Sequence, residues 1–400
     1  MPEALVIGAG IAGPTAAMAL QKVGVEATIY EAYGTTAHGV GGTIGLSTNG
    51  LDGLRALGAH EAVRSAGFPT SEVVTWIGRG RRVGSYDRGS ALPDGTVSLT
   101  VRRTDLYAVL RTEALRRGIR IEHGKRLVGV EQCRDAVLAR FADGDEAVGG
   151  ILIGADGMRS RTRQLVDPNA PPPCYAGLVA TGGCAATDLA PTPNALHLVF
   201  GRRAFFGYTV CDDGTAWWFA NLRIAREPTP EALSAVSQRE WRGRLLAAFA
   251  GDVPVAAHVV RATRHDLEFG PMHCMDPPAR WHRSRMALIG DAAHVSSPTS
   301  AQGAALAIED ALVLARCVRD RDEPAAAFAT FQRLRQRRVQ RVVDAARRVN
   351  RRKAAGPLTR GIRHALMRVS ARTARPDVDA WLYDHRIDFA APVDWDRGGG

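Results

Sequence analysis

The stretch that decides the fold is "ALVIGAGIAGPTAAMALQKVGVEATIYEA", residues 4–32. Its first four residues are apolar and predict a buried strand. Gly8, Gly10 and Gly13 follow at G-x-G-x-x-G spacing, and the residues after them predict a helix and then a second strand. This order of strand, glycine turn, helix and strand predicts a Rossmann-like unit that binds a dinucleotide.

Each part of this unit has a mechanical role. Gly8 permits the tight turn, Gly10 lets a pyrophosphate approach the backbone, and Gly13 lets the helix pack closely on the strand. The helix directs its free N–H groups and its positive end at the phosphates. Glu31, at the end of the second strand, can accept hydrogen bonds from both hydroxyls of a ribose, and its charge disfavours a 2′-phosphate. The unit therefore predicts FAD or NAD rather than NADP, and the choice between FAD and NAD stays open at this point.

Length and composition predict a soluble, cytoplasmic protein. With 400 residues and 46% hydrophobic content, the chain can bury a sizeable core and form two or three domains. No run approaches the roughly 20 apolar residues that cross a bilayer, and the first strand begins too early for a charged leader. The six cysteines are scattered, without metal-ligand spacing, so we expect free buried thiols and no metal site.

The net charge of +11 is concentrated near the C-terminus. Residues 333–375 hold 14 arginines and one lysine against a single acid, Asp344. Such a segment could bind nucleic acid or an anionic membrane surface. However, apolar residues recur in it at helical spacing and no aromatic residue interleaves the arginines, which favours a helix with a solvated face. We therefore expect no nucleic-acid partner and no stable membrane association.

Two further segments repeat the pattern of an apolar strand followed by a glycine-containing turn. "GGILIGADGMRSRTRQLV", residues 149–166, has a strand before Asp156 and Gly157. "RMALIGDAAHVSSPTSAQGAALAIEDALVLA", residues 285–315, has a strand before Asp291 and a helix that begins near Gln302 and runs to about residue 319. A carboxylate directly after a buried strand is costly unless a donor reaches it, so a bound hydroxyl is the preferred explanation for Asp291.

In this order, the three segments resemble those of the single-component FAD monooxygenases built like p-hydroxybenzoate hydroxylase, over residues 1 to about 320. The resemblance implies that the first turn binds the adenosine and pyrophosphate of FAD, that Asp291 binds the ribityl chain, and that the helix beginning near Gln302 lies beside the flavin. The helix dipole would there favour the negative charge that appears on reduction. Ala301 replaces a glycine of the family's P-x-x-G-Q-G pattern, which puts close approach of the backbone to the flavin in question. The implied cofactor-binding residues are Gly8, Gly10, Gly13, Glu31, Arg103, Asp156, Gly157, Asp291, Pro298, Gln302 and Gly303.

The implied fold is α/β, with a Rossmann-like FAD-binding domain, an inserted and mainly antiparallel substrate domain, and C-terminal helices. We expect the FAD-binding domain in 1–70, 100–170 and 275–320, the substrate domain in 71–99 and 171–274, and the C-terminal helical region in 321–400. Alternating patterns in 72–86 and 174–225 predict the strands of the substrate domain. We expect substrate contacts from Arg203, Tyr208 and Trp218, although a buried aromatic residue usually belongs to the core.

The resemblance implies a monooxygenase that uses NADH or NADPH and O2. It would hydroxylate or epoxidise an electron-rich aromatic or polycyclic small molecule through a C4a-hydroperoxyflavin. A second G-x-G-x-x-G unit is missing from the sequence, so the nicotinamide nucleotide is expected to bind transiently. No catalytic side chain is identifiable, and a monomer or a homodimer is expected.

Three other functions are considered. One is an FAD-dependent reductase or dehydrogenase of the same fold that inserts no oxygen. Another is a flavin halogenase, which is disfavoured because its W-x-W-x-I-P signature and its lysine beyond the first domain are missing. The last is a non-catalytic regulator that binds a polymer through residues 333–375.

Overall fold

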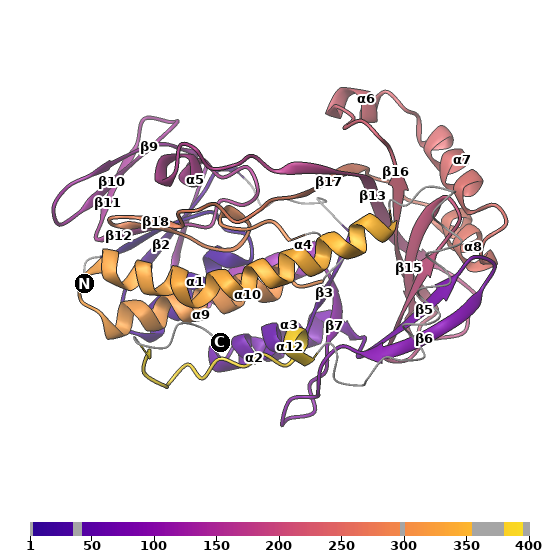
Figure 1. The fold of residues 1–400 in the computed structure, drawn as a ribbon, viewed down its shortest axis with the longest axis horizontal. Helices are drawn as coiled ribbons and strands as arrows, with labels where there is room; N and C mark the ends of the chain where they lie inside the picture. The colour runs from indigo at the N-terminus through magenta and orange to yellow at the C-terminus, as the bar shows by residue number, and fades with distance from the viewer. Residues whose placement is uncertain (1–2, 35–41, 297–300, 354–379, 395–400) are drawn as a thin grey trace.

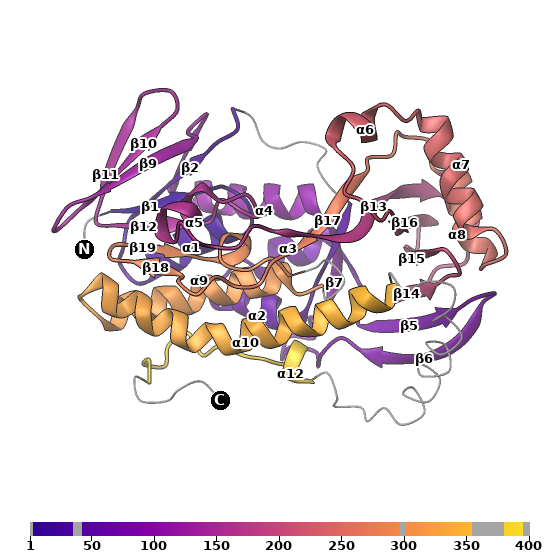
Figure 2. The ribbon, with the colours of Figure 1, turned by 45° about the horizontal axis from the view of Figure 1, so that its top comes forward.

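Two bodies make up the molecule, and one long helix, α10 (Pro324–Lys353), runs along both of them (Figure 1). The computed structural model describes residues 3–34, 42–296, 301–353 and 380–394. One body surrounds a sheet that begins at the N-terminus, and the other surrounds a larger, mainly antiparallel sheet. Figure 2 shows from a second direction that α10 reaches from the first body to the second.

A six-stranded sheet organises the first body, in the order β18-β19-β12-β1-β2-β8. Strand β1 pairs in parallel with β2 and β12, so that Ala4 lies opposite Ala27 and Ile151. All four residues of β1 are buried, which is typical of a parallel strand covered on both faces. The strands predicted at the three glycine-containing segments are confirmed. The sheet consists of β1 (Ala4–Ile7), β2 (Ala27–Glu31), β8 (Arg120–His123), β12 (Ile151–Gly154), β18 (His282–Arg283) and β19 (Met286–Leu288).

Two helices of the first body, α1 and α9, begin where the sequence predicts them. Helix α1 follows the first glycine turn, and Pro14 occupies its third position, where a missing N–H removes no bond within the helix. Helix α9 begins at Gly303 and packs against α1, α2 and α10. The helices of this body are α1 (Ala12–Lys22), α2 (Thr48–Ala56), α3 (His60–Ala66), α4 (Arg103–Arg116), α5 (Arg161–Val166), α9 (Gly303–Asp320) and α12 (Ala380–Tyr383), with a 3-10 turn, η1 (Gly290–Ala292).

The second body contains a seven-stranded sheet in the order β17-β13-β16-β15-β14-β5-β6. The pairing is antiparallel except between β14 and β5. Strands β5 and β6 come from the predicted segment 71–99, and the other five come from 171–274. The strands are β5 (Glu72–Ile77), β6 (Arg81–Asp87), β13 (Cys174–Ala186), β14 (Ala195–Phe200), β15 (Ala204–Val210), β16 (Thr215–Arg223) and β17 (Gly270–Cys274), and the helices are α6 (Pro230–Ser234), α7 (Gln238–Phe249) and α8 (Pro254–Ala262).

The two faces of this sheet have different neighbours. Ala216, Trp218 and Ala220 of β16 are buried in one core with residues of α7 and α8. Because side chains alternate along a strand, Phe219 and Asn221 lie on the opposite face. Figure 1 shows α7 and α8 on the outer side of the sheet and the first body on its other side. The face that carries Phe219 is therefore turned towards the first body.

Two three-stranded sheets complete the described structure. One contains β3 (Thr43–Leu46), β4 (Gly67–Pro69) and β7 (Leu99–Arg102), and the other contains β9 (Leu127–Gln132), β10 (Val137–Phe141) and β11 (Glu146–Gly149). No helix among the described residues combines the length and apolar character needed to span a membrane. All six cysteines are free, as predicted, but only Cys317 is fully buried, and Cys133 and Cys174 are exposed. The expectation of uniformly buried thiols is therefore wrong, because most of them lie on partly solvated strands and loops.

Candidate active site

The first glycine turn has the geometry that the motif predicts. Gly8 has a φ of +107°, and a Cβ there would lie 2.5 Å from the carbonyl oxygen of Ala155. A Cβ on Gly13 would lie 1.9 Å from the carbonyl oxygen of Gly8. A Cβ on Gly10, in contrast, would meet no atom within 4 Å. Gly8 and Gly13 are therefore required by the protein itself, whereas Gly10 faces open space that a ligand can fill.

Glu31 lies beside this turn. Its carboxylate accepts hydrogen bonds from the backbone N–H groups of Ala9, at 2.7 Å, and Tyr33, at 3.0 Å. These two bonds fix the carboxylate at the carboxyl end of β2, next to the start of α1. The position suits a ribose contact, as the sequence predicts.

Asp156 also lies next to the first turn, but its carboxylate is hydrogen-bonded to other residues of the protein. It accepts bonds from the backbone N–H of Thr162, at 2.9 Å, from the Thr162 hydroxyl, at 3.0 Å, and from the Ser160 hydroxyl. Desolvation raises the pKa of Asp156, and these hydrogen bonds lower it. Gly157 has a φ of +74°, and a Cβ there would meet no atom within 4 Å. Asp156 thus fixes the start of α5 next to the first glycine turn.

Asp291 lies in η1, where its side chain is exposed but closely flanked by protein. Desolvation raises its pKa, and the charges of His294, Arg103 and Arg163 lower it. The Nε atom of Arg103 is buried and has no hydrogen-bond partner within the described part of the chain. An orphaned donor near an accessible carboxylate is the arrangement expected where a polar ligand binds.

Arg163 is a residue of this region that the sequence reasoning did not single out. Its guanidinium donates to the carbonyl oxygens of Met158, at 2.7 Å, and Ala292, at 3.1 Å. It therefore ties the segment of Asp156 and Gly157 to the turn that carries Asp291. Three arginines at alternate positions, 159, 161 and 163, gave no signal of which one turns inward.

The side chain of Gln302 is fully buried at the start of α9. It is held by Asn49 of α2 and by Ser47, the residue that precedes α2. Its Oε1 atom accepts from Asn49 at 2.9 Å, and its Nε2 atom donates to the hydroxyl of Ser47 at 2.6 Å. Asn49 also donates to Glu309 at 2.7 Å. A chain of hydrogen bonds thus fixes the first residues of α9, and Asn49 and Glu309 are members that the sequence did not reveal.

Ala301 adopts a φ of +51°, a left-handed conformation that favours glycine. A Cβ on Gly45 of β3 would lie 2.9 Å from the Ala301 methyl group. The departure from the family pattern at Ala301 therefore falls where a glycine would relieve strain. Gly303 faces open space, whereas Pro298 lies outside the described residues.

A buried ionic network stands behind η1 and α9. Asp310 pairs with His294 at 2.6 Å and with Arg335 at 2.7 Å. Glu309 pairs with Arg335 and with Arg338, each at 2.7 Å. Burial alone would raise the pKa values of both carboxyls, but these cations outweigh it and lower them. The inward arginines of the basic segment are therefore structural.

The structure does not bring the three predicted substrate contacts together. Trp218 is fully buried against α7 and α8, and its indole N–H donates to the Thr263 hydroxyl at 2.9 Å. Tyr208 lies on the same covered face, where its hydroxyl is 3.2 Å from Nδ1 of His197. Arg203 is exposed in the turn before β15. Strand alternation therefore argues against Tyr208 and Trp218 as substrate contacts.

The opposite face of the sheet carries a different aromatic group. Phe200 and Phe205 have ring centroids 4.9 Å apart, and Phe219 lies 6.0 Å from Phe205. Asn221 shares this face, and Lys353, at the end of α10, reaches it. These side chains, rather than Trp218, face the first body.

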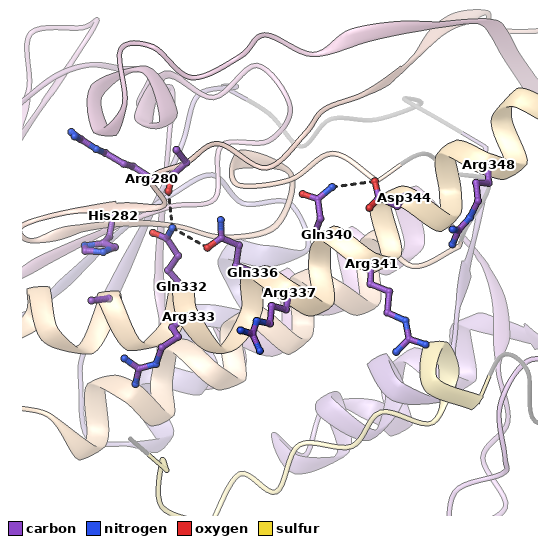
Figure 3. A pocket seen from close by; sticks show the side chains of 12 residues that line it. Arg280, His282, Gln332, Arg333, Gln336, Arg337, Gln340, Arg341, Asp344 and Arg348 are labelled. Atoms are coloured by element: carbon purple, nitrogen blue, oxygen red, sulfur yellow. Dashed lines mark hydrogen bonds between the residues drawn. The ribbon is translucent and has the colours of Figure 1, made fainter. Parts of the chain in front are cut away.

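A basic cavity of about 880 Å³ lies along the outer side of α10 (Figure 3). Arg333, Arg337 and Arg341 line it and are exposed, as predicted for the solvated face of this helix. The guanidinium of Arg341 also stacks on Trp381 at 3.9 Å. None of the predicted cofactor residues lines this cavity, so it is separate from the glycine turns.

Comparisons with known proteins show the family to which this chain belongs. A family model described as FAD binding domain matches residues 1–346. A 3-amino-4-hydroxybenzoate 2-monooxygenase of Streptomyces platensis is 32% identical over 401 aligned residues, covering 98% of this chain and 97% of that protein. The crystal structure of Klebsiella pneumoniae HpxO complexed with FAD and uric acid has a TM-score of 0.81 and 27% identity, covering 93% of this chain and 94% of that one. The chain belongs to the FAD-dependent aromatic hydroxylase family.

This aromatic hydroxylase is therefore an FAD-dependent monooxygenase with the fold of p-hydroxybenzoate hydroxylase, as the sequence predicted. Its own residues fit FAD, because Gly10 faces open space and the buried Nε of Arg103 lacks a partner within the described residues. A further relative, the aurachin C monooxygenase/isomerase of Stigmatella aurantiaca, is 30% identical over 348 residues, covering 86% of this chain and 88% of that protein.

Proposed function

We propose that this hydroxylase uses NADH or NADPH and O2 to transfer one oxygen atom to an electron-rich aromatic or polycyclic small molecule, by hydroxylation or epoxidation. The observation that carries the proposal is the aromatic face of Phe205 and Phe219, which is turned towards the body that holds the FAD motifs. Relatives over most of the chain are named for acting on 3-amino-4-hydroxybenzoate and 6-hydroxynicotinate, both small aromatic acids.

In this proposal the two ends of FAD are held by different segments. The first turn, with Glu31, binds the adenosine and pyrophosphate, and the D-G segment lies beside it. Arg103 and Asp291 bind the ribityl region, because one offers an orphaned donor and the other an accessible acceptor. Gln302 and Gly303 present the start of α9 to the flavin ring.

When bound, FAD supplies the two-electron redox chemistry and the activation of O2. The chain supplies the surroundings for that chemistry. The N-terminus of α9 carries about half a positive charge, which favours negative charge next to Gln302. The phenylalanine-rich face excludes water from the ring that is to be oxidised.

We also propose a division of labour between the two bodies. Segments 1–70, 100–170 and 275–320 act as the FAD-binding domain, and segments 71–99 and 171–274 act as the substrate domain. The C-terminal region, 321–400, joins them through α10. Nucleic acid is not needed to explain the arginines of α10, because Arg341 stacks on Trp381 and Arg347 pairs with Asp276.

A library of aromatic acids, phenols and purines tests this function. The purified protein is mixed with FAD, NADH or NADPH, and each compound. Nicotinamide oxidation, hydrogen peroxide and the oxygenated product are then measured together. We expect at least one compound to accelerate nicotinamide oxidation with little peroxide released. Acceleration without any oxygenated product would instead favour the reductase or dehydrogenase alternative.

A further inference from the structure

Lys353 is the last described residue of α10 and one of only three lysines in the chain. The other two have surface roles, since Lys22 is exposed at the end of α1 and Lys125 pairs with Asp143 and Asp145. Lys353 instead reaches the second body. Its Nζ atom donates to Oδ1 of Asn221 at 3.1 Å and lies 3.7 Å from the centroid of the Phe205 ring.

The contacts of Lys353 fix the face on which it lies. Asn221 and Phe205 are directly opposite each other across β16 and β15, so their side chains share one face of the sheet. Phe219, two residues before Asn221, shares that face, and Trp218 lies on the other. Figures 1 and 2 both show the end of α10 meeting this sheet on the side of the first body. The ammonium group is therefore on the aromatic face rather than in the core beneath α7 and α8.

This face also approaches the FAD-binding body. Strand β3 contacts β16, and a Cβ on Gly42, just before β3, would lie 4.0 Å from the Cα of Gly182. Gly182 is the residue opposite Phe219 in the pairing of β13 with β16. A ring held against Phe219 would thus lie near β3, which also contacts α9.

No acidic side chain among the described residues balances the charge of Lys353. Among the described residues it forms no ion pair, and Asn221 takes only one of its three N–H donors. Lys353 is partly buried, and desolvation lowers its pKa to about 7. A partly desolvated cation without a counter-charge is unfavourable, and an anionic oxygen placed beside it would reduce that cost. The ring of Phe205 offers only a weaker, cation–π attraction.

We propose that Lys353 and Asn221 form the anion-binding end of the substrate site, where they take an aromatic acid by its carboxylate or ionised hydroxyl group. The substrate ring then lies against Phe219 on the same face. This inference rests on the proposed function, because it places an aromatic substrate on this face. It assigns to α10 a role in choosing anionic over neutral aromatic compounds.

Calorimetric titration of the oxidised, FAD-loaded protein tests the proposal. Two pairs of probes are used: 4-hydroxybenzoate with 4-hydroxybenzamide, and 4-nitrophenolate with 4-nitroanisole. We expect the unsubstituted protein to prefer the anion of at least one pair by about tenfold or more, the value of a charge-assisted hydrogen bond. The pair that shows the preference identifies the carboxylate or the ionised hydroxyl as the group recognised.

Three variants isolate the lysine. Lys353→Met should abolish the preference for the anion, Lys353→Arg should keep part of it, and Lys22→Met, which removes an exposed lysine, should leave it unchanged. Lys353→Met removes a desolvated charge, so it should melt no lower than the unsubstituted protein and retain FAD. If that variant nevertheless fails to fold, Asn221→Leu provides the second test, because it removes the orienting acceptor and should weaken the preference.

The proposal is overturned if the unsubstituted protein binds neither anion more tightly than its neutral partner, or if Lys353→Met keeps the full preference. Because the titration needs no reductant, no O2 and no turnover, its result is independent of the proposed reaction. A protein that prefers anions through Lys353 but forms no oxygenated product would disprove the proposed function and leave the binding site standing.

Discussion

The Nε2 atom of His294 lies 2.6 Å from the Oδ2 atom of Asp310, and both side chains are completely buried. The same oxygen accepts the backbone N–H of Gly290 at 2.9 Å. Asp310 belongs to α9, so this helix anchors both ends of the turn that presents Asp291. His294 thus holds the turn, while Asp291 stays accessible.

This division of roles predicts different effects of substitution at Asp291 and His294. Asp291→Ala should raise the Kd for FAD roughly tenfold or more, because a hydrogen bond to a charged group is lost. The melting temperature of the FAD-free protein should stay almost unchanged. His294→Ala should lower that temperature, since it leaves Asp310 with fewer partners. Asp188→Ala, at an exposed carboxylate of the second body, is the control and should alter neither quantity. Equal effects of the two changes on FAD binding would contradict the assignment.

Glu309 predicts a stability that depends on pH. Its pKa in the folded protein lies below its ordinary value, because Arg335 and Arg338 outweigh the effect of burial. Its contribution is therefore complete above the unfolded pKa of about 4.3 and declines as the pH falls towards the folded value. Glu309→Gln should cost about 3–5 kcal/mol at pH 7, as expected for a broken buried ion pair, and less at pH 3. Urea unfolding at the two pH values measures this difference.

A matched control for that change is Glu61→Gln. Glu61 pairs with Arg64 on the exposed side of α3, and such surface pairs contribute about 0–1 kcal/mol. Unfolding free energies that fall equally in the two variants at pH 7 would show that the network around Glu309 carries no special stability.

Substitutions at Gly13 and Gly10 of the first turn should have different effects, one on stability and the other on FAD affinity. Gly13→Ala should destabilise the protein itself, because the new methyl group would overlap the Gly8 carbonyl oxygen. Gly10→Ala meets no protein atom, so the FAD-free protein should melt normally while its affinity for FAD falls. Thermal melting and fluorescence titration with FAD measure the two quantities. Normal FAD affinity in Gly10→Ala would place the pyrophosphate elsewhere.

Replacing Ala301 with glycine should stabilise the protein. The φ of +51° at Ala301 costs an L-residue about 1–2 kcal/mol in the folded state. A glycine would remove this cost, but it would also make the unfolded chain more flexible, which offsets part of the gain. Ala301→Gly should therefore raise the free energy of unfolding by up to about 1 kcal/mol. Ala304→Gly, three residues further along the chain and inside α9, should lower it by about the same amount. Unfolding curves in which both changes destabilise would show that Ala301 is not strained.

The parts of the site that sequence predicts are those in which backbone chemistry requires one residue type. Gly8 and Gly13 are forced by φ or by close approach, and Glu31 follows from its place at the end of a strand. Strand alternation could be predicted, but not which face of β16 would be covered by α7 and α8. The sequence therefore could not show that Trp218 lies on the covered face.

Long-range side-chain contacts gave no sequence signal. Asn49 meets Gln302 across 253 residues, and Lys353 meets Asn221 across 132. The helical spacing of Val339 and Val342 places Arg335 on the buried face, but nothing in the local pattern identifies Glu309 and Asp310 as its partners. Such residues become visible only when the fold has placed α10 against both bodies.

The central claim is that this chain places an aromatic compound beside FAD and transfers oxygen to it. Turnover under 18O2, with mass analysis of the product, tests that claim most directly. We predict one atom of 18O in the product for each nicotinamide nucleotide consumed in the coupled reaction. A product that carries oxygen only from water, or nicotinamide oxidation that yields peroxide alone with every aromatic compound, would contradict it.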